Sequence, residues 1–258
     1  MVDLAKLKDA NIRRWNAAKL TRGPEFIPVA KRLVAAKERY KTVERATGVP
    51  WPFIAVTHQR ESSQNWNRSL AQGDPWNQVS THVPAGRGPF GSWEAAAIDA
   101  LVNCAPYASR NKDWSIGGLL TKLEEYNGLG YAAKGVPSPY IWSGTDQYRS
   151  GKYVADHVYD ANAVDKQLGC AGLIMAMMSL DPSIKFDGAA IRQTTTLPPP
   201  KAPVSTATKA GAGAVVAGAA GTIAVGVQQG WGATPWLIAA GLAAMFAFVV
   251  YLIRKADR

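Results

Sequence analysis

Apolar residues recur at helical spacing along most of the first 190 positions, and stretches rich in Gly and Pro separate these patterns. Pro24 and Pro28 are expected to separate the first two helices. Only residues 140–142 favour a short strand. The predicted helices cover residues 3–22, 29–46, from 51 to the neighbourhood of Glu61, 92–102, 115–126, 152–160 and 163–180. The sequence therefore predicts a mainly α domain over residues 1–190, with residues 1–45 as basic N-terminal helices.

The C-terminal quarter has a different pattern. Residues 191–209 are rich in Pro and Thr and lack an apolar face, which is typical of a linker. Residues 210–227 and 236–253 are uncharged and long enough to cross a bilayer. Basic residues flank the outer ends of this region, so the positive-inside rule favours a transmembrane helical hairpin with both ends cytoplasmic. A single span is the alternative.

Charge and cysteine usage narrow the class of protein. The formal net charge is +10, and residues 1–45 hold 12 basic and 5 acidic side chains. A basic end suits an anionic lipid or cell-wall surface; because no nucleic-acid motif accompanies it, we expect no nucleic-acid partner. Cys104 and Cys170 lie in apolar helical patterns and are expected to be buried free thiols, with one disulfide as the alternative.

The N-terminus lacks the apolar core of a secretory signal peptide. Combined with the predicted C-terminal hairpin, this indicates a membrane-anchored protein whose preceding domain is initially cytoplasmic.

Glu61 is the first candidate for chemistry. It lies where a mostly apolar helix gives way to the polar cluster Arg60–Asn65. Burial at such a border raises the pKa of a carboxyl group, which a general acid near neutral pH requires. The alternative is a Glu at a helix end that pairs with Arg60 or Arg68. Residues 67–92 follow, a Gly/Pro-rich segment with several aromatic rings that is too long for a simple connection.

The order of Glu61-Ser62, this aromatic segment and Tyr126-Asn127-Gly128 resembles the lysozyme-like superfamily, notably goose-type lysozymes and soluble lytic transglycosylases. The stretches HQRESSQNW, QGDPWNQVSTHVPAGRGPFGSWEAAAIDAL and EEYNGLGYAAKGVPSPYIWSGTDQYRSGKYVADHVYD also look like a phage and prophage endolysin group of that superfamily. The chain departs from the transglycosylase pattern, because Gly88-Pro89-Phe90-Gly91 stands where that family has Gly-Leu-Met-Gln. Hydrolysis and anhydro-sugar formation both stay open.

The resemblance implies an α+β lysozyme-like domain that cleaves the β-1,4 bond between N-acetylmuramic acid and N-acetylglucosamine, without a metal or another cofactor. Glu61 would be the general acid, Asp74 would activate water and Thr81, or Ser80 beside it, would position that water. Asp74 as an ordinary turn residue before Pro75 is the alternative. The implied substrate-binding residues are Ser62, His82, Tyr126, Asn127, Tyr140 and Trp142.

The implied partners are peptidoglycan and the lipid bilayer of a bacterial inner membrane, with self-association or a holin as a partner within the membrane. Two other classes stay open. His58, Glu61 and His82 could serve a zinc-dependent amidase or peptidase, although no His-Glu-x-x-His spacing is present. A non-enzymatic, holin-like membrane protein with a wall-binding domain is the second.

Overall fold

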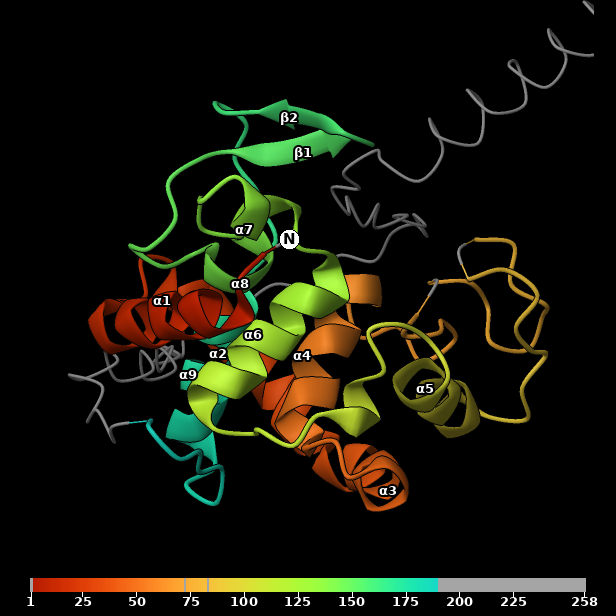
Figure 1. The fold of residues 1–258 in the computed structure, drawn as a ribbon. Helices are drawn as coiled ribbons and strands as arrows, with labels where there is room; N and C mark the ends of the chain where they lie inside the picture. The colour runs from red at the N-terminus through yellow and green to blue at the C-terminus, as the bar shows by residue number, and fades with distance from the viewer. Residues whose placement is uncertain (1, 72, 83, 190–258) are drawn as a thin grey trace, which may run out of the picture. The chain divides into compact units, whose positions relative to one another are not determined.

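Helices make up most of the regular structure in residues 2–71, 73–82 and 84–189, the part of the chain that the computed structural model describes (Figure 1). This confirms the mainly α prediction. The helices are α1 (Leu4–Ala17), α2 (Gly23–Ala35), α3 (Lys37–Thr47), α4 (Trp51–Ser62), α5 (Trp93–Val102), α6 (Ile116–Asn127), α7 (Gly130–Ala133), α8 (Pro139–Trp142) and α9 (Cys170–Leu180), with a short 3-10 helix at Ala108–Arg110.

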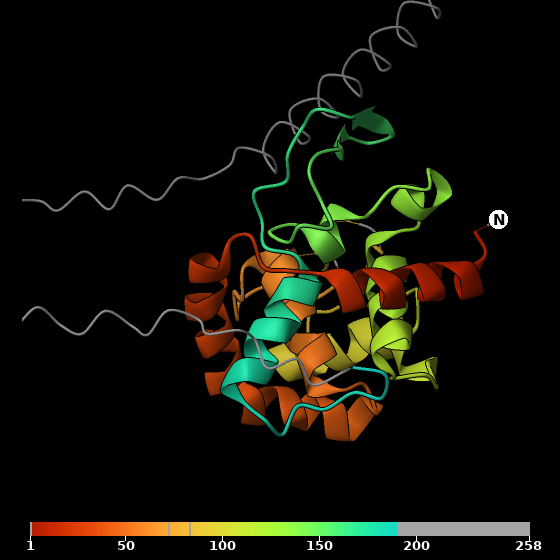
Figure 2. The same ribbon diagram turned by 90° about the vertical axis from the view of Figure 1, so that its left-hand side faces the viewer.

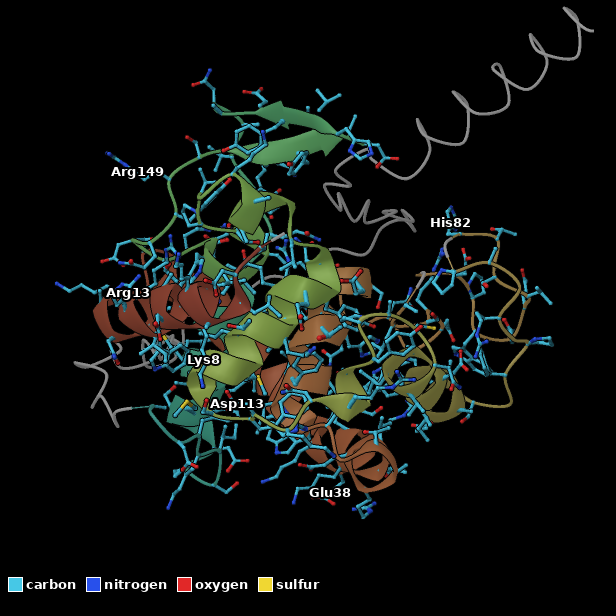
Figure 3. All side chains as sticks on the ribbon, viewed as in Figure 1. Lys8, Arg13, Glu38, His82, Asp113 and Arg149 are labelled. Atoms are coloured by element: carbon cyan, nitrogen blue, oxygen red, sulfur yellow. The ribbon has the colours of Figure 1, made fainter. Side chains whose placement is uncertain are left out.

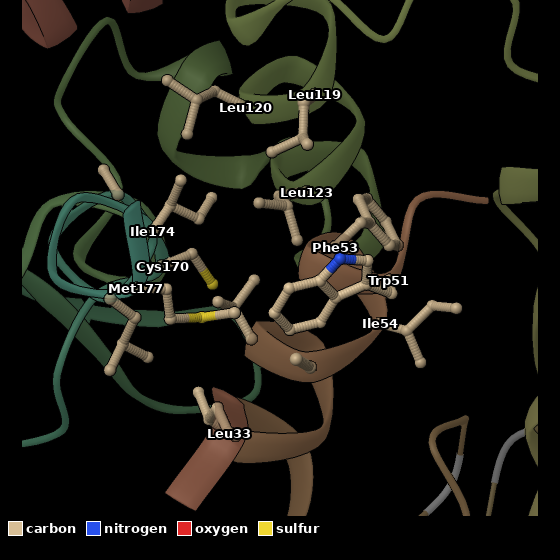
Figure 4. Close-up of a cluster of buried hydrophobic side chains, with 14 of the residues drawn as sticks. Leu33, Trp51, Phe53, Ile54, Leu119, Leu120, Leu123, Cys170, Ile174 and Met177 are labelled. Carbon is tan, nitrogen blue, oxygen red and sulfur yellow. The ribbon is translucent and has the colours of Figure 1, made fainter. Parts of the chain in front are cut away.

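The core is built around α4. Every residue from Trp51 to His58 is buried, as expected for a helix that is apolar on most of its circumference. Helices α2, α3, α6 and α9 pack against it. In Figure 4 side chains of α4 meet those of α6 and α9; the labelled residues are Trp51, Phe53, Ile54, Leu119, Leu120, Leu123, Cys170, Ile174 and Met177, with Leu33 from α2. Figure 2 shows α9 alongside α2, with which it also makes contact.

Side chains at the ends explain where several helices begin. The Asp3 carboxylate accepts from the backbone nitrogens of Ala5 and Lys6 and so caps α1. Ser92 caps α5 through a 3.1 Å hydrogen bond from the Ala95 nitrogen. Helix α6 ends at Asn127, where Gly128 adopts φ of 91°, and this confirms the predicted stop.

The two N-terminal prolines do not separate helices, so the prediction of one helix over residues 29–46 is wrong. Pro24 lies in the first turn of α2, where a missing N–H costs nothing, and Pro28 is accommodated inside the same helix. The break comes instead at Ala36, whose φ of −91° and ψ of 9° leave the helical region between α2 and α3.

Residues 152–160 form a β-hairpin rather than the predicted helix. Strands β1 (Lys152–Ala155) and β2 (Val158–Asp160) pair antiparallel, with Tyr153 opposite Tyr159. Valine and tyrosine favour strands, and the two tyrosine rings lie 5.5 Å apart across the pair. The Tyr131 hydroxyl accepts from the Tyr153 nitrogen and ties the hairpin to α7.

Two further predictions need correction. Residues 140–142 belong to α8 and not to a strand, because Ser138 and Pro139 start a helical turn in which the Trp142 nitrogen donates to the Ser138 carbonyl. The last helix begins at Cys170, not at residue 163. Asp165 is held instead through its backbone. Its nitrogen donates to the Tyr148 hydroxyl, and its carbonyl accepts from the Ser143 hydroxyl.

Cys104 and Cys170 are buried and free, as predicted. Among the helices that the structure describes, none has the length and apolar character needed to cross a lipid bilayer. The predicted linker at 191–209 and the predicted membrane segments at 210–227 and 236–253 lie outside the described residues.

Candidate active site

The turn that ends α4 fixes the position of Glu61. Ser63 and Gln64 follow with φ of 55° and 61°, a left-handed conformation that residues other than glycine seldom adopt. The side-chain nitrogen Nε2 of Gln64 donates to the Arg32 carbonyl and to the Tyr40 hydroxyl, both at 3.2 Å. Helices α2 and α3 therefore stabilise this turn, and strained turns of this kind concentrate at functional sites.

Glu61 directs its carboxyl group at Tyr140 of α8. The Tyr140 hydroxyl donates a 2.8 Å hydrogen bond to Oε1. Removal from water raises the pKa of Glu61 to about 7, against the smaller opposing effects of the Tyr140 hydrogen bond and the Arg60 charge. A carboxyl group with this pKa is protonated in a large fraction of molecules at neutral pH, so it can act as a general acid.

Arg60 does not neutralise Glu61, although it is its neighbour in the chain. Its guanidinium group lies 2.9 Å from Oδ2 of Asp165, and both side chains are only 6% exposed. It also stacks over the Tyr140 ring at 4.8 Å. Among the described residues Glu61 has no ion-pair partner. The alternative prediction, a Glu paired with Arg60 or Arg68, is therefore wrong.

The Tyr-Asn-Gly segment reaches the same site. Tyr126 is close enough to Glu61 for the carboxylate charge to add to the rise in the tyrosine's pKa, which burial dominates. Its hydroxyl donates to the Leu70 carbonyl at 3.1 Å. Asn127 is exposed at the end of α6. The Ser62 hydroxyl donates back to the His58 carbonyl within α4, so Ser62 is used for the helix end.

A cavity of about 330 Å³ opens next to Arg60 and Tyr140, and Glu61 itself is not among its lining residues. Its lining is mostly polar and comes from the end of α4, the end of α6, α8 and the β-hairpin; it includes Arg60, Asn127, Tyr140, Tyr153, His157 and Gln167. Arg60 and Tyr140, which flank the Glu61 carboxyl group, form part of this wall. A second cavity, of about 400 Å³, lies at Trp51 and Trp114, at the opposite end of α4 from Glu61.

The segment after α4 returns to Glu61. Gly73 lies so close that a β-carbon built on it would be 3.8 Å from the Glu61 carbonyl oxygen. The Arg68 guanidinium group donates a 2.9 Å hydrogen bond to the Gly73 carbonyl, and the Tyr126 hydroxyl donates to the Leu70 carbonyl. These contacts place Asp74, the next residue, near the end of α4.

Asp74 is buried and accepts three hydrogen bonds. Its Oδ2 accepts from the backbone nitrogens of Thr81 at 2.9 Å and His82 at 3.0 Å, and its Oδ1 lies 2.6 Å from Nδ1 of His82. Burial opposes ionisation, but the hydrogen bonds and the nearby imidazole prevail and hold the pKa of Asp74 below its ordinary value. Thr81 contributes its backbone nitrogen here, and His82 contributes both backbone and ring.

Tyr140 and Trp142, both predicted to contact sugar, have other surroundings. Tyr140 lines the cavity but its hydroxyl is engaged by Glu61. Trp142 is fully buried in the core and presents no surface to a ligand. The sequence did not single out Arg60 with Asp165, nor the hairpin residues on the cavity wall. The tyrosines and valines between Lys152 and Asp160 were a sequence signal for the hairpin. The Arg60–Asp165 contact joins residues 105 positions apart, and no local sequence pattern predicts it.

His58 does not fit the role of a zinc ligand. Its Nδ1 lies 3.0 Å from the Tyr40 hydroxyl and its Nε2 lies 3.1 Å from the Asn65 carbonyl, so both ring nitrogens are already engaged. Burial lowers the pKa of His58 to about 4. Within residues 2–71, 73–82 and 84–189, no group of three His, Cys, Asp or Glu side chains could hold a metal ion.

Comparison of the chain with protein-family models, curated proteins and solved structures gives no match.

Proposed function

We propose that the protein is a peptidoglycan-degrading enzyme that cleaves the β-1,4 bond between N-acetylmuramic acid and N-acetylglucosamine, with Glu61 as the general acid. One observation carries the proposal: the Glu61 carboxyl group, with a pKa of about 7, lies beside an open polar cavity and is fixed by Tyr140. Cleavage of a glycosidic bond requires a positioned carboxylic acid that is still protonated at the working pH.

In this mechanism the Glu61 proton passes to the glycosidic oxygen as the bond to the anomeric carbon breaks. The developing positive charge on the sugar is accommodated by the Glu61 carboxylate that results. Asn127 at the end of α6 and polar groups on the β-hairpin would bind flanking sugars, since all of them line the same cavity.

The finer fold assignment is part of the proposal. A buried central helix that ends in the acid, with a long segment on one side and a β-hairpin domain on the other, is consistent with a lysozyme-like domain. The resemblance of the sequence to phage endolysins supports a role in host-cell lysis. Anchoring in the inner membrane by residues 210–253 is proposed on the apolar pattern of that segment alone.

The test is turnover of purified peptidoglycan sacculi by the full-length protein in mild detergent. Glu61→Gln keeps the shape of the side chain but cannot donate the proton, so we expect release of soluble muropeptides to fall by at least about 100-fold. Glu38→Gln is the matched control, because Glu38 is exposed on α3 and points away from the site (Figure 3).

Mass spectrometry of the released fragments identifies the bond that is cut. New sugar ends would support a glycosidase, whereas free amino groups from cut peptide bonds would support an amidase or peptidase. Turnover by Glu61→Gln at the rate of Glu38→Gln would contradict the proposal.

A further inference from the structure

Asp74 and His82 form a second chemical group near Glu61. The Asp74 side chain is 9% exposed, whereas the His82 side chain is 70% exposed, and Oδ1 and Nδ1 lie 2.6 Å apart. A buried carboxylate joined to an exposed imidazole is the arrangement that orients a histidine for proton transfer. The pair therefore offers more than a turn before Pro75.

The hydrogen bonds determine which ring nitrogen is available. Both oxygens of Asp74 accept, and an ionised carboxylate has no proton to give. Nδ1 of His82 must therefore be the donor. In the neutral imidazole, Nε2 then carries the free lone pair, and it belongs to the exposed end of the ring.

Asp74 itself is poorly suited to take a proton from water. It is buried, its oxygens already accept three hydrogen bonds, and its pKa lies below the ordinary value. A weak base without free lone pairs facing solvent activates water inefficiently. The better base of the pair is His82.

The pair is placed by the same contacts that connect the segment to α4 and α6. Gly73, next to Asp74, lies against the Glu61 carbonyl, and the Leu70 carbonyl accepts from Tyr126, which is close to Glu61. Figure 3 shows His82 on the upper edge of the segment after α4, the side on which the hairpin also lies. The Asp74–His82 pair is thus tied to the end of α4 that carries Glu61.

We propose that His82, oriented by Asp74, is the general base that activates water in the reaction of Glu61, so that the protein hydrolyses its substrate. This inference rests on the function proposed above. The water oxygen bonds to the anomeric carbon while the bond from that carbon to the glycosidic oxygen breaks. One water proton goes to Nε2 of His82, and the Glu61 proton goes to the leaving oxygen. Asp74 is then a positioning residue, and Thr81 serves through its backbone nitrogen.

The test compares His82→Gln, His82→Ala and Asp74→Asn in the full-length protein on sacculi. Gln can still donate to Asp74 but has no basic nitrogen, so it separates folding of the segment from proton transfer. Val79→Ala is the matched control, because Val79 is exposed in the same segment. Circular dichroism checks that each variant is folded.

We expect both His82 variants to lose about 100-fold or more in kcat with little change in KM. We expect Asp74→Asn to lose kcat as well, since the Asn oxygen keeps the two backbone donors and its NH2 group then faces Nδ1, from which it cannot accept the ring proton.

Turnover of His82→Gln at the rate of Val79→Ala would overturn the inference, as would a loss confined to KM. Release of 1,6-anhydro sugars by the unmodified protein would also overturn it, because no water then takes part. Each of these results leaves the role of Glu61 intact, whereas full activity of Glu61→Gln would overturn the proposed function itself.

Discussion

The bond between Tyr140 and Glu61 does two things for a single carboxyl group. It fixes the direction of Oε1, and it lowers the pKa of Glu61 from the still higher value that burial alone would give. For Tyr140→Phe we therefore expect the pKa of Glu61 to rise. The acid then keeps its proton to higher pH, and the basic limb of the kcat/KM profile on sacculi moves to more alkaline values.

At its optimum, Tyr140→Phe should be slower by about tenfold, because the acid is less well oriented. A basic limb that moves to lower pH would contradict this assignment. The unmodified protein itself should lose activity as the pH rises through about 7, where Glu61 ionises.

Local sequence was sufficient to single out Glu61 as a candidate acid and insufficient to predict its hydrogen-bond partner. A helix that turns polar at its end is visible within the stretch Trp51–Asn65. Tyr140 is 79 positions away and meets Glu61 only because α8 packs beside α4 and α6. For the same reason Asp74 was found as a carboxylate near a turn, whereas its bond to His82 depends on how the segment folds back.

Between elements, the contact of α1 with α6 contains a second carboxyl group of raised pKa. Glu124 is 2% exposed, and burial raises its pKa to about 7, although Asn11 and Arg14 of α1 act in the opposite direction. Among the residues that the structure describes, the Asn11 side-chain oxygen has no hydrogen-bond partner, and the Asn11 side-chain nitrogen lies 3.5 Å from Oε2 of Glu124. A protonated Glu124 could donate to that oxygen, so the neutral acid suits this interface.

Folding therefore favours the protonated form of Glu124. The stability that this contributes is present at pH 4.5 and is lost as the pH rises to about 7, by up to about 3 kcal/mol. Glu124→Gln should show a correspondingly flatter pH dependence in urea unfolding between pH 5 and 8. The raised pKa of Glu61 affects stability in the same direction, but Glu61 is present in both the unmodified protein and Glu124→Gln. The difference between their unfolding free energies therefore reports on Glu124 alone. The control Glu38→Gln should show the pH dependence of the unmodified protein.

Long helices were predictable because each carries its own signal. Ser92 and Ser115 cap their helices, and Gly128 ends one. The hairpin at residues 152–160 was missed because a few alternating residues also fit a helix. What decides between them is contact with Tyr131, which lies more than 20 positions earlier.

At the scale of the whole described unit, the ion pair of Arg60 and Asp165 joins the end of α4 to the segment before α9. Both side chains are almost completely buried, and Arg60 also stacks on Tyr140 and forms part of the cavity wall. Removing one member of a buried ion pair is costly, because the other charge then stays buried without a partner. This pair is thus one of the contacts that join two distant parts of the chain around the site.

Asp165→Leu should lower the free energy of unfolding by about 3–5 kcal/mol, because it leaves the Arg60 guanidinium buried and unpaired. Arg60→Met/Asp165→Leu removes both charges, so it should be more stable than Asp165→Leu alone. Lys8→Ala is the control for an exposed pair: Lys8 and Asp113, labelled in Figure 3, are 38% and 41% exposed, and we expect a loss of about 1 kcal/mol or less.

Urea unfolding followed by circular dichroism at pH 7 measures all three variants. If the double variant were as unstable as Asp165→Leu, shape at the contact rather than an unpaired charge would account for the loss. The double variant also changes the site in a predictable direction. Because the Arg60 charge lowers the pKa of Glu61, its removal should raise that pKa and move the basic limb of activity to higher pH, as in Tyr140→Phe. Stability and acid strength at this site are therefore coupled through one arginine.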